Sequence, residues 1–294
     1  MVTRGCVSRG VGYGLGLLAA GYLAAAPASA QSLTYTGSLQ GSSGDYIFTE
    51  RTTGIYLVNG VELAAGRLTV SASLPVIGQS TPWVSQGPVL VPSGGRYSGE
   101  VVRQVDQMRR AGRMGRTMVA LPPVEQGVGS SFGVGDPLVR AEVEVVAGTS
   151  SRPSVRVSAS AKAPLADPDD GFGTGAWDYG VGAAVTTRVG RGTVLADLAY
   201  WRMGDLPDLE LRDGAGYSLG YGHLLGSGRW SLLGSVSGWT TIIDGAQPPL
   251  QLGVGLGRLL ARGRSVSVNL GVGLTETAPD VSVGLGWRLG PRSG

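Results

Sequence analysis

The residues of this sequence best suited to chemistry are charged side chains at every second position of two neighbouring segments. Arg140, Glu142 and Glu144 alternate with aliphatic residues, and Arg156 and Lys162 follow the same rule further along. Alternate residues of a β-strand share one face, so the spacing predicts a charged face on a two-stranded hairpin. Such a face is open to two uses: a constriction that selects solutes by charge, or ion pairs that hold a wall together.

Acidic residues in other segments extend this charged face. The full set predicted to line a lumen is Glu62, Arg140, Glu142, Glu144, Arg156, Lys162, Asp178 and Asp197. Centring the hairpin on Ser150 sets Glu144 opposite Arg156, and we expect these two side chains to be in contact as an ion pair.

A second acidic group lies between the segments and predicts extracellular loops. Its members are Asp167, Asp169, Asp170, Asp205 and Asp208. The carboxylates from Asp167 to Gly171 could attract a calcium ion, but the bidentate glutamate and spacing of a known calcium loop are missing. Because Asp and Gly also favour turns, the sequence predicts a solvated turn and no metal site.

Enzyme chemistry has little support in the sequence. His223 is the only histidine, and the only cysteine, Cys6, precedes the expected mature chain. These residues cannot form the common zinc sites, and no dinucleotide-binding motif precedes a helix. A membrane-embedded lipid hydrolase with a serine–histidine pair is the rival, but His223 falls at the turn end of its predicted strand, away from the outer leaflet. We therefore expect no enzyme and no cofactor.

The elements that must position these residues are strands. Apolar and polar residues alternate with a period of two, in segments of about ten residues, the length that a tilted strand needs to cross a bilayer. No charge-free apolar run after Ala30 is long enough for a spanning helix. The predicted strands are 32–40, 53–64, 67–76, 134–147, 153–163, 176–188, 193–203, 214–224, 229–241, 249–260, 265–274 and 280–289.

The connections alternate between tight turns and longer loops. Arginines occur at the tight turns, and acidic residues occur in the longer loops. Aromatic residues gather at both ends of the strands, and Trp201 and Trp239 are assigned to a belt on the loop side. Short periplasmic turns, longer outer loops and two aromatic belts are typical of a transmembrane antiparallel up-and-down β-barrel. The fold class is thus all-β, in the bacterial outer membrane, with a soluble β-protein as the alternative.

Two segments stand apart from the barrel. Residues 1–30 carry a positive start, a short apolar run and the triplet Ala28-Ser29-Ala30, which predict a cleaved signal peptide; residues 31–294 form the barrel. Loop 77–133 is long, with a basic stretch at 99–117, and is expected to cap the lumen, bind anionic lipopolysaccharide or extend into solvent. The arginines of the remaining chain are scattered, so they do not predict a basic surface that binds nucleic acid.

Several motifs occur in order along the chain: Gly135-Asp136, the segment from Lys162 to Asp178, Ala199 to Asp205, and Thr277 to Gly284. Together they resemble the phenol-degradation-pathway (MetA-type) family of outer-membrane transporters. The segment from Lys162 to Asp178 is similar to its "K-x-P-T-G…G-x-G-T-G-x-x-D" stretch, with Leu165 in place of the threonine. The chain ends without the terminal aromatic residue of such barrels. The resemblance implies an outer-membrane barrel and suggests uptake of hydrophobic or aromatic compounds.

The expected function is passive passage of small solutes, with outer-membrane lipid, lipopolysaccharide and a small-molecule solute as partners and the oligomeric state open. The alternatives are a non-conducting structural barrel and a barrel that binds ligands through its surface loops.

Overall fold

We analysed a computed structural model, which describes residues 31–44, 51–80, 131–167, 172–205, 211–226, 228–242, 247–261 and 263–290. The expected signal peptide, the basic stretch 99–117 and the acidic residues Asp169, Asp170 and Asp208 lie outside these ranges. Within them, no helix has the length and hydropathy that a membrane span requires.

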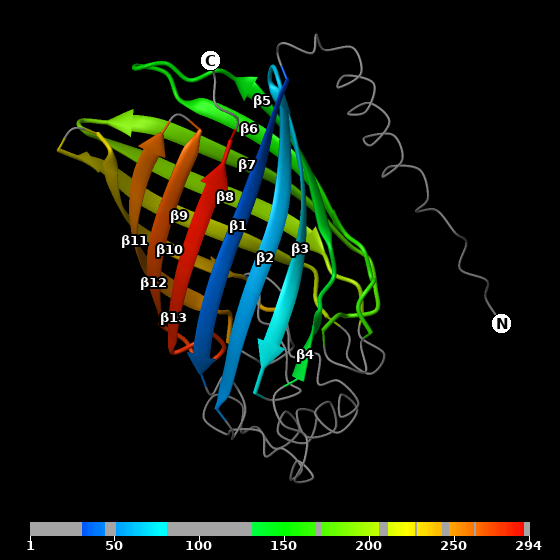
Figure 1. The fold of residues 1–294 in the computed structure, drawn as a ribbon. Helices are drawn as coiled ribbons and strands as arrows, with labels where there is room; N and C mark the ends of the chain where they lie inside the picture. The colour runs from blue at the N-terminus through cyan, green and yellow to red at the C-terminus, as the bar shows by residue number, and fades with distance from the viewer. Residues whose placement is uncertain are drawn as a thin grey trace.

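The described chain is built from antiparallel strands (Figure 1). Their bounds are β1 (Gln31–Gly44), β2 (Thr52–Ala65), β3 (Leu68–Gln79), β4 (Ser131–Val134), β5 (Leu138–Val146), β6 (Ser154–Lys162), β7 (Asp178–Val189), β8 (Gly192–Arg202), β9 (Gly214–Leu225), β10 (Trp230–Trp239), β11 (Leu250–Ala261), β12 (Arg264–Gly273) and β13 (Val281–Leu289).

Sequential pairing closes these strands into one barrel. Each strand from β5 to β13 pairs with the next, β13 pairs with β1, and β1, β2 and β3 continue the sheet back to β4 and β5. Both β4 and β5 pair with β3, at opposite ends of it, so they occupy a single place in the wall. The result is the twelve-stranded all-β barrel that the alternating sequence predicts.

The fourth predicted strand differs from the structure in one respect. Residues 134–147 were expected to be continuous, whereas the strand breaks at Gly135-Asp136-Pro137. Pro137 has no N–H for the ladder, and the N–H of Gly135 turns to the carbonyl of Pro75, at 2.9 Å. The long loop is also shorter than 77–133, because β3 continues through Gln79 and β4 begins at Ser131.

One end of the barrel, the turn end, carries the tight turns that were predicted, and the other, the loop end, carries the longer connections. In Figure 1 the turn end is at the top. Gly66 and Gly190 open two-residue turns with φ of 59° each, a conformation that glycine adopts without steric cost. These turns keep neighbouring strands in register from one end.

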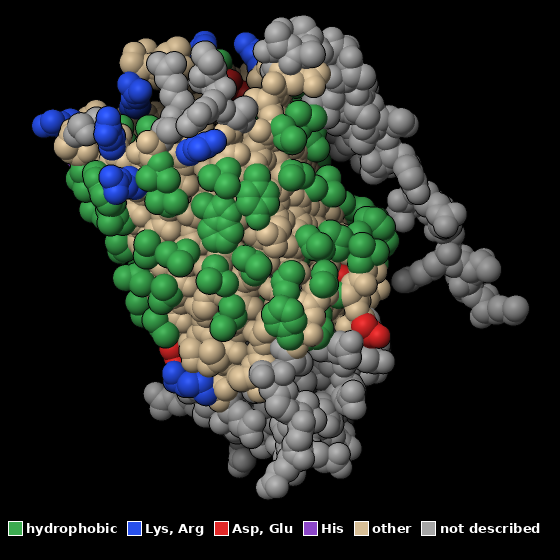
Figure 2. Space-filling model, in the orientation of Figure 1, with side chains coloured by type: hydrophobic (Ala, Val, Ile, Leu, Met, Phe, Trp, Pro, Cys, Tyr) green, Lys and Arg blue, Asp and Glu red, His purple; other side chains and the backbone are tan. Residues whose placement is uncertain are grey.

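The barrel presents its apolar face outward. Leu252, Val254 and Leu256 on β11 and the alternate valines of β12 and β13 are exposed. Figure 2 shows hydrophobic side chains forming a band across the visible face of the wall, with basic side chains gathered beyond it at the turn end. Water cannot stabilise such a band, whereas hydrocarbon can. The structure is therefore that of a bacterial outer-membrane protein.

Candidate functional site: the interior of the barrel

A cluster of charged side chains lies on the inner face of β5, β6 and β8. Arg140 is 3.0 Å from Glu142 and 4.0 Å from Asp197, and Arg156 is 3.2 Å from Glu142. Ala184 separates Arg156 from Asp197 in the cross-strand row, and its small side chain leaves room between them. We call Arg140, Glu142, Arg156 and Asp197 the mid-wall cluster.

The register that sequence reasoning proposed for this hairpin is confirmed, but its ion pair is different. Glu144 lies directly opposite Arg156. Its carboxylate nevertheless accepts a hydrogen bond from the hydroxyl of Ser154, at 2.9 Å, while Arg156 forms its ion pair with Glu142. The predicted ion pair between Glu144 and Arg156 was therefore wrong, although both residues lie on the inner face as predicted.

Glu62, on β2, belongs to a second ion pair that the sequence analysis did not identify. Arg288 on β13 donates to both carboxylate oxygens of Glu62, at 2.6 and 3.0 Å, and reaches across β1 beside Thr36. Two parallel N–H donors fit a carboxylate well. Apolar and polar residues alternate along β13 and place Arg288 on the polar face. This pattern could have indicated that Arg288 faces the lumen and can reach Glu62.

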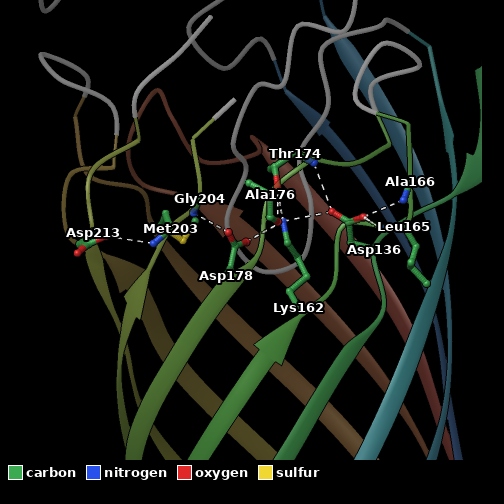
Figure 3. Close-up of polar contacts among 10 residues, drawn as sticks. All are labelled: Asp136, Lys162, Leu165, Ala166, Thr174, Ala176, Asp178, Met203, Gly204 and Asp213. Atoms are coloured by element: carbon green, nitrogen blue, oxygen red, sulfur yellow. Dashed lines mark hydrogen bonds and ion pairs between the residues drawn. The ribbon is translucent and has the colours of Figure 1, made fainter. Parts of the chain in front are cut away.

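Lys162 and Asp178 do not line an open lumen as predicted; they form a buried network at the loop end (Figure 3). The Nζ of Lys162, the one lysine of the chain, lies 2.7 Å from Asp178, 2.7 Å from the hydroxyl of Thr174 and 3.3 Å from Asp136. An ammonium group has three donors, and all three are used here. A charged group this deeply buried is stable only with such partners.

The aspartates of this network also hold backbone N–H groups of the connecting segments. Asp136 accepts from the N–H groups of Leu165, Ala166 and Thr174, and Asp178 accepts from that of Gly204 at 2.8 Å. The break in the fourth strand is what turns Asp136 toward Lys162. The network thus fastens the ends of β5, β6, β7 and β8 together, which gives the motifs from Gly135 to Asp205 a structural role.

Two further aspartates fasten the loop end in the same manner. Asp213 accepts from the N–H of Met203, at 3.1 Å, and Asp205 accepts from the N–H of Leu211, at 3.0 Å. Asp205 is exposed and holds the far end of its own connection through this hydrogen bond. Asp167, the other described member of the predicted acidic loops, lies in the β6–β7 connection. Within the described ranges, no group of three metal-ligating side chains is suitably placed for an ion.

The β6–β7 connection also folds against the inner wall. The ring of Phe172 is buried and packs on Ile77 of β3, which is fully buried, with Tyr56 and Ala166 around them. Gly133 on β4 leaves room for this ring, because a side chain there would overlap it. An aromatic ring therefore narrows the loop end of the lumen on the side of β2, β3 and β4.

The wall opposite the mid-wall cluster is made mostly of small residues. Gly253, Gly255 and Gly257 occupy inner positions of β11, opposite Ser235, Leu233 and Ser231 of β10 and beside Asn269 and the serines of β12. The serine and asparagine side chains lie over these glycines, since a Cβ at Gly255 would be 2.5 Å from Asn269 and one at Gly286 of β13 would be 2.7 Å from the hydroxyl of Ser267. Most side chains on this wall are therefore short and polar.

Trp201 and Trp239 were assigned to the lipid-facing belt, but they lie on the inner face. Trp201 covers Gly180 and Trp239 covers Gly216, each at 2.7 Å from the position of a Cβ. Their neighbours Tyr200 and Tyr217 face outward and are exposed. Alternation already required this, since Tyr200 and Trp201 cannot share a face.

His223 lies on the outer face of β9, near the turn end, in register with Leu232 of β10. Its ring is thus separated by the wall from the charged residues of the interior.

The closed antiparallel barrel, its apolar outer band and its polar interior together define an outer-membrane β-barrel. The model of the family described as "Putative MetA-pathway of phenol degradation" matches residues 34–289, and the chain belongs to this family. No curated protein sequence matches the chain.

Several solved structures are similar to this chain at low sequence identity. An outer membrane channel from Pseudomonas putida F1 is 14% identical, with 90% of this chain and 97% of that chain covered and a TM-score of 0.59. The CymD monoaromatic hydrocarbon channel is 10% identical over 89% and 87%, with a TM-score of 0.43. Outer membrane phospholipase A from Escherichia coli is 12% identical over 88% and 91%, with a TM-score of 0.39.

Proposed function

We propose that the chain is a passive outer-membrane channel for small solutes, with no enzymatic activity. The observation that carries this proposal is the exposure of charged side chains on the inner face. The side chains of Arg156 and Arg288 are 41% and 46% exposed although both face inward, and glycines and serines make up much of the wall opposite Arg156. Exposed charges on an inner face need water, because desolvating them without full pairing is costly.

The lumen has two features that act on a solute. The mid-wall cluster supplies charge of both signs, so it offers hydrogen bonds to a polar group without strong attraction for either ion. At the loop end, Trp201 and Trp239 provide aromatic surface on the inner side, and planar rings stack on such surface. This combination favours small uncharged solutes with an aromatic body and a polar group, consistent with the phenol in the family description.

Solute-induced swelling of proteoliposomes tests this proposal. Vesicles that contain the refolded protein should admit small sugars, and admit a hydroxylated aromatic such as 4-hydroxybenzyl alcohol faster than protein-free vesicles do. Entry rates should fall with increasing solute size without saturation at high concentration, as passive diffusion requires. A non-conducting barrel, the alternative, would leave sugar entry at the rate of empty vesicles.

A further inference from the structure

The outer face of β10 to β13 carries an unusual row at the turn-end edge of the apolar band. Arg258 on β11 is in register with Trp230 on β10 and with Val266 on β12, and Val266 is in register with Trp287 on β13. Arg264 projects from the same face one step closer to the turn, opposite Leu289. Two arginines thus lie among indole rings on the surface that faces lipid.

Arg258 is held in place without an acidic partner. Its guanidinium lies 5.0 Å from the centroid of the Trp230 ring, and both side chains are exposed. The ring covers one face of the planar group, which leaves the N–H donors along its edge available. Among the residues that the structure describes, no carboxylate pairs with Arg258 or Arg264.

The surroundings add positive charge. The tight turns at this end contribute Arg67, Arg152, Arg191 and Arg229, and the sequence places no aspartate or glutamate in them. Figure 2 shows basic side chains adjoining the edge of the hydrophobic band at this end. An anion that reaches this edge therefore meets an unopposed positive field.

The depth of the row identifies the anion. Arginine is expensive on the lipid face at mid-bilayer and nearly free of cost near the interface, and tryptophan prefers the level of the headgroups. The row of Trp230, Arg258 and Trp287 therefore lies at headgroup level, where phosphate groups are present. A guanidinium edge matches the geometry of a phosphate, which it binds through two donors.

We infer that Arg258 and Arg264, with Trp230, bind the phosphate of an anionic glycerophospholipid in the leaflet at the turn end. Short turns are periplasmic in bacterial barrels, so this leaflet is the periplasmic one and phosphatidylglycerol has the required chemistry. The site is independent of conduction, since it lies on the opposite side of the wall from the lumen.

Native mass spectrometry of the detergent-solubilised barrel tests this site. With equal amounts of phosphatidylglycerol and zwitterionic phosphatidylethanolamine, the wild-type protein should retain several-fold more of the anionic lipid. The double variant Arg258→Gln/Arg264→Gln should lose that preference. The matched control Arg202→Gln, which removes an exposed arginine at the loop end of β8, should keep it. Gel mobility before and after boiling shows that each variant is folded.

Four results would contradict the inference. The wild-type protein could show no preference between the two lipids, or the double variant could retain phosphatidylglycerol as well as the wild type does. Millimolar inorganic phosphate could displace the lipid completely, in which case the site binds free phosphate rather than a headgroup. Displacement by lipid A at lower concentration would instead contradict the assignment to the periplasmic leaflet.

Discussion

The guanidinium of Arg156 lies 3.2 Å from the carboxylate of Glu142, although the residue directly opposite it in the sheet is Glu144. Long side chains reach diagonal neighbours across a strand pair, and the register shifts between Glu144 and Val146. Glu144 is held instead by Ser154. The pairing on this hairpin therefore follows side-chain reach and the local irregularity rather than direct opposition.

A double-mutant cycle separates the two candidate pairs. Glu142→Gln and Arg156→Gln should be coupled by about 0.2–1 kcal/mol, toward the lower end because Arg156 is 41% exposed and solvent screens the pair. Glu144→Gln and Arg156→Gln should be additive. Urea unfolding in detergent or lipid vesicles measures both cycles, and coupling confined to Glu144 would show that the direct pair forms.

Removing Lys162 should be among the most damaging single changes in the barrel. Lys162→Met leaves Asp136 and Asp178 buried without their cation, a state that costs about 3–5 kcal/mol. The free energy of unfolding measures the loss. Arg188→Gln, which removes an exposed arginine of β7, is the control and should stay within about 0.5 kcal/mol. Because Lys162 is the one lysine of the chain, slow amine labelling of the folded protein reports its burial independently, and fast labelling would contradict the network.

Two inner glycines of β9 should respond differently to the same substitution. A Cβ at Gly216 would lie 2.7 Å from the Trp239 ring, whereas one at Gly222 would be 3.8 Å from its nearest neighbour, Leu233. Gly216→Ala should therefore cost about 1–3 kcal/mol through overpacking, and Gly222→Ala should be neutral or stabilising. Unfolding midpoints compare the two, and equal midpoints would mean that Trp239 does not cover Gly216.

Much of this architecture follows from alternation in the sequence alone. The period of two predicted the twelve places in the wall and the inner face of Glu62, Arg140 and Asp197, because a one-residue slip would have turned the apolar band inward. Alternation describes faces and not contacts, so it could not decide which glutamate Arg156 would meet. It also could not show that Lys162 is buried, since that depends on a connecting segment folding back over the strand ends.

The sequence alone indicates the break in the fourth predicted strand only in part. Pro137 is a local signal of an interruption. The pairing of β4 with β3 on the other side of the break could be predicted only with knowledge of the partner strand. The position of Phe172 is similar: nothing local to its glycine-rich segment indicates that its ring packs on Ile77, a residue distant in sequence.

Phe172 should control the width of the loop end. Phe172→Ala removes the ring that packs on the inner wall, so the unitary conductance should rise. Leu165→Ala, in the same connection but 75% exposed, should leave it unchanged and serves as the control. An unaltered conductance in Phe172→Ala, with the barrel shown to be folded, would place the narrowest point elsewhere.

The most direct test of the proposed channel is the current through single molecules of the refolded wild-type protein in a planar bilayer. A water-filled lumen lined by Arg156, Glu142 and small residues predicts discrete, ohmic conductance steps with weak selectivity between cations and anions, because charges of both signs face the lumen. A folded, membrane-inserted barrel that produces no steps at any voltage would contradict the account.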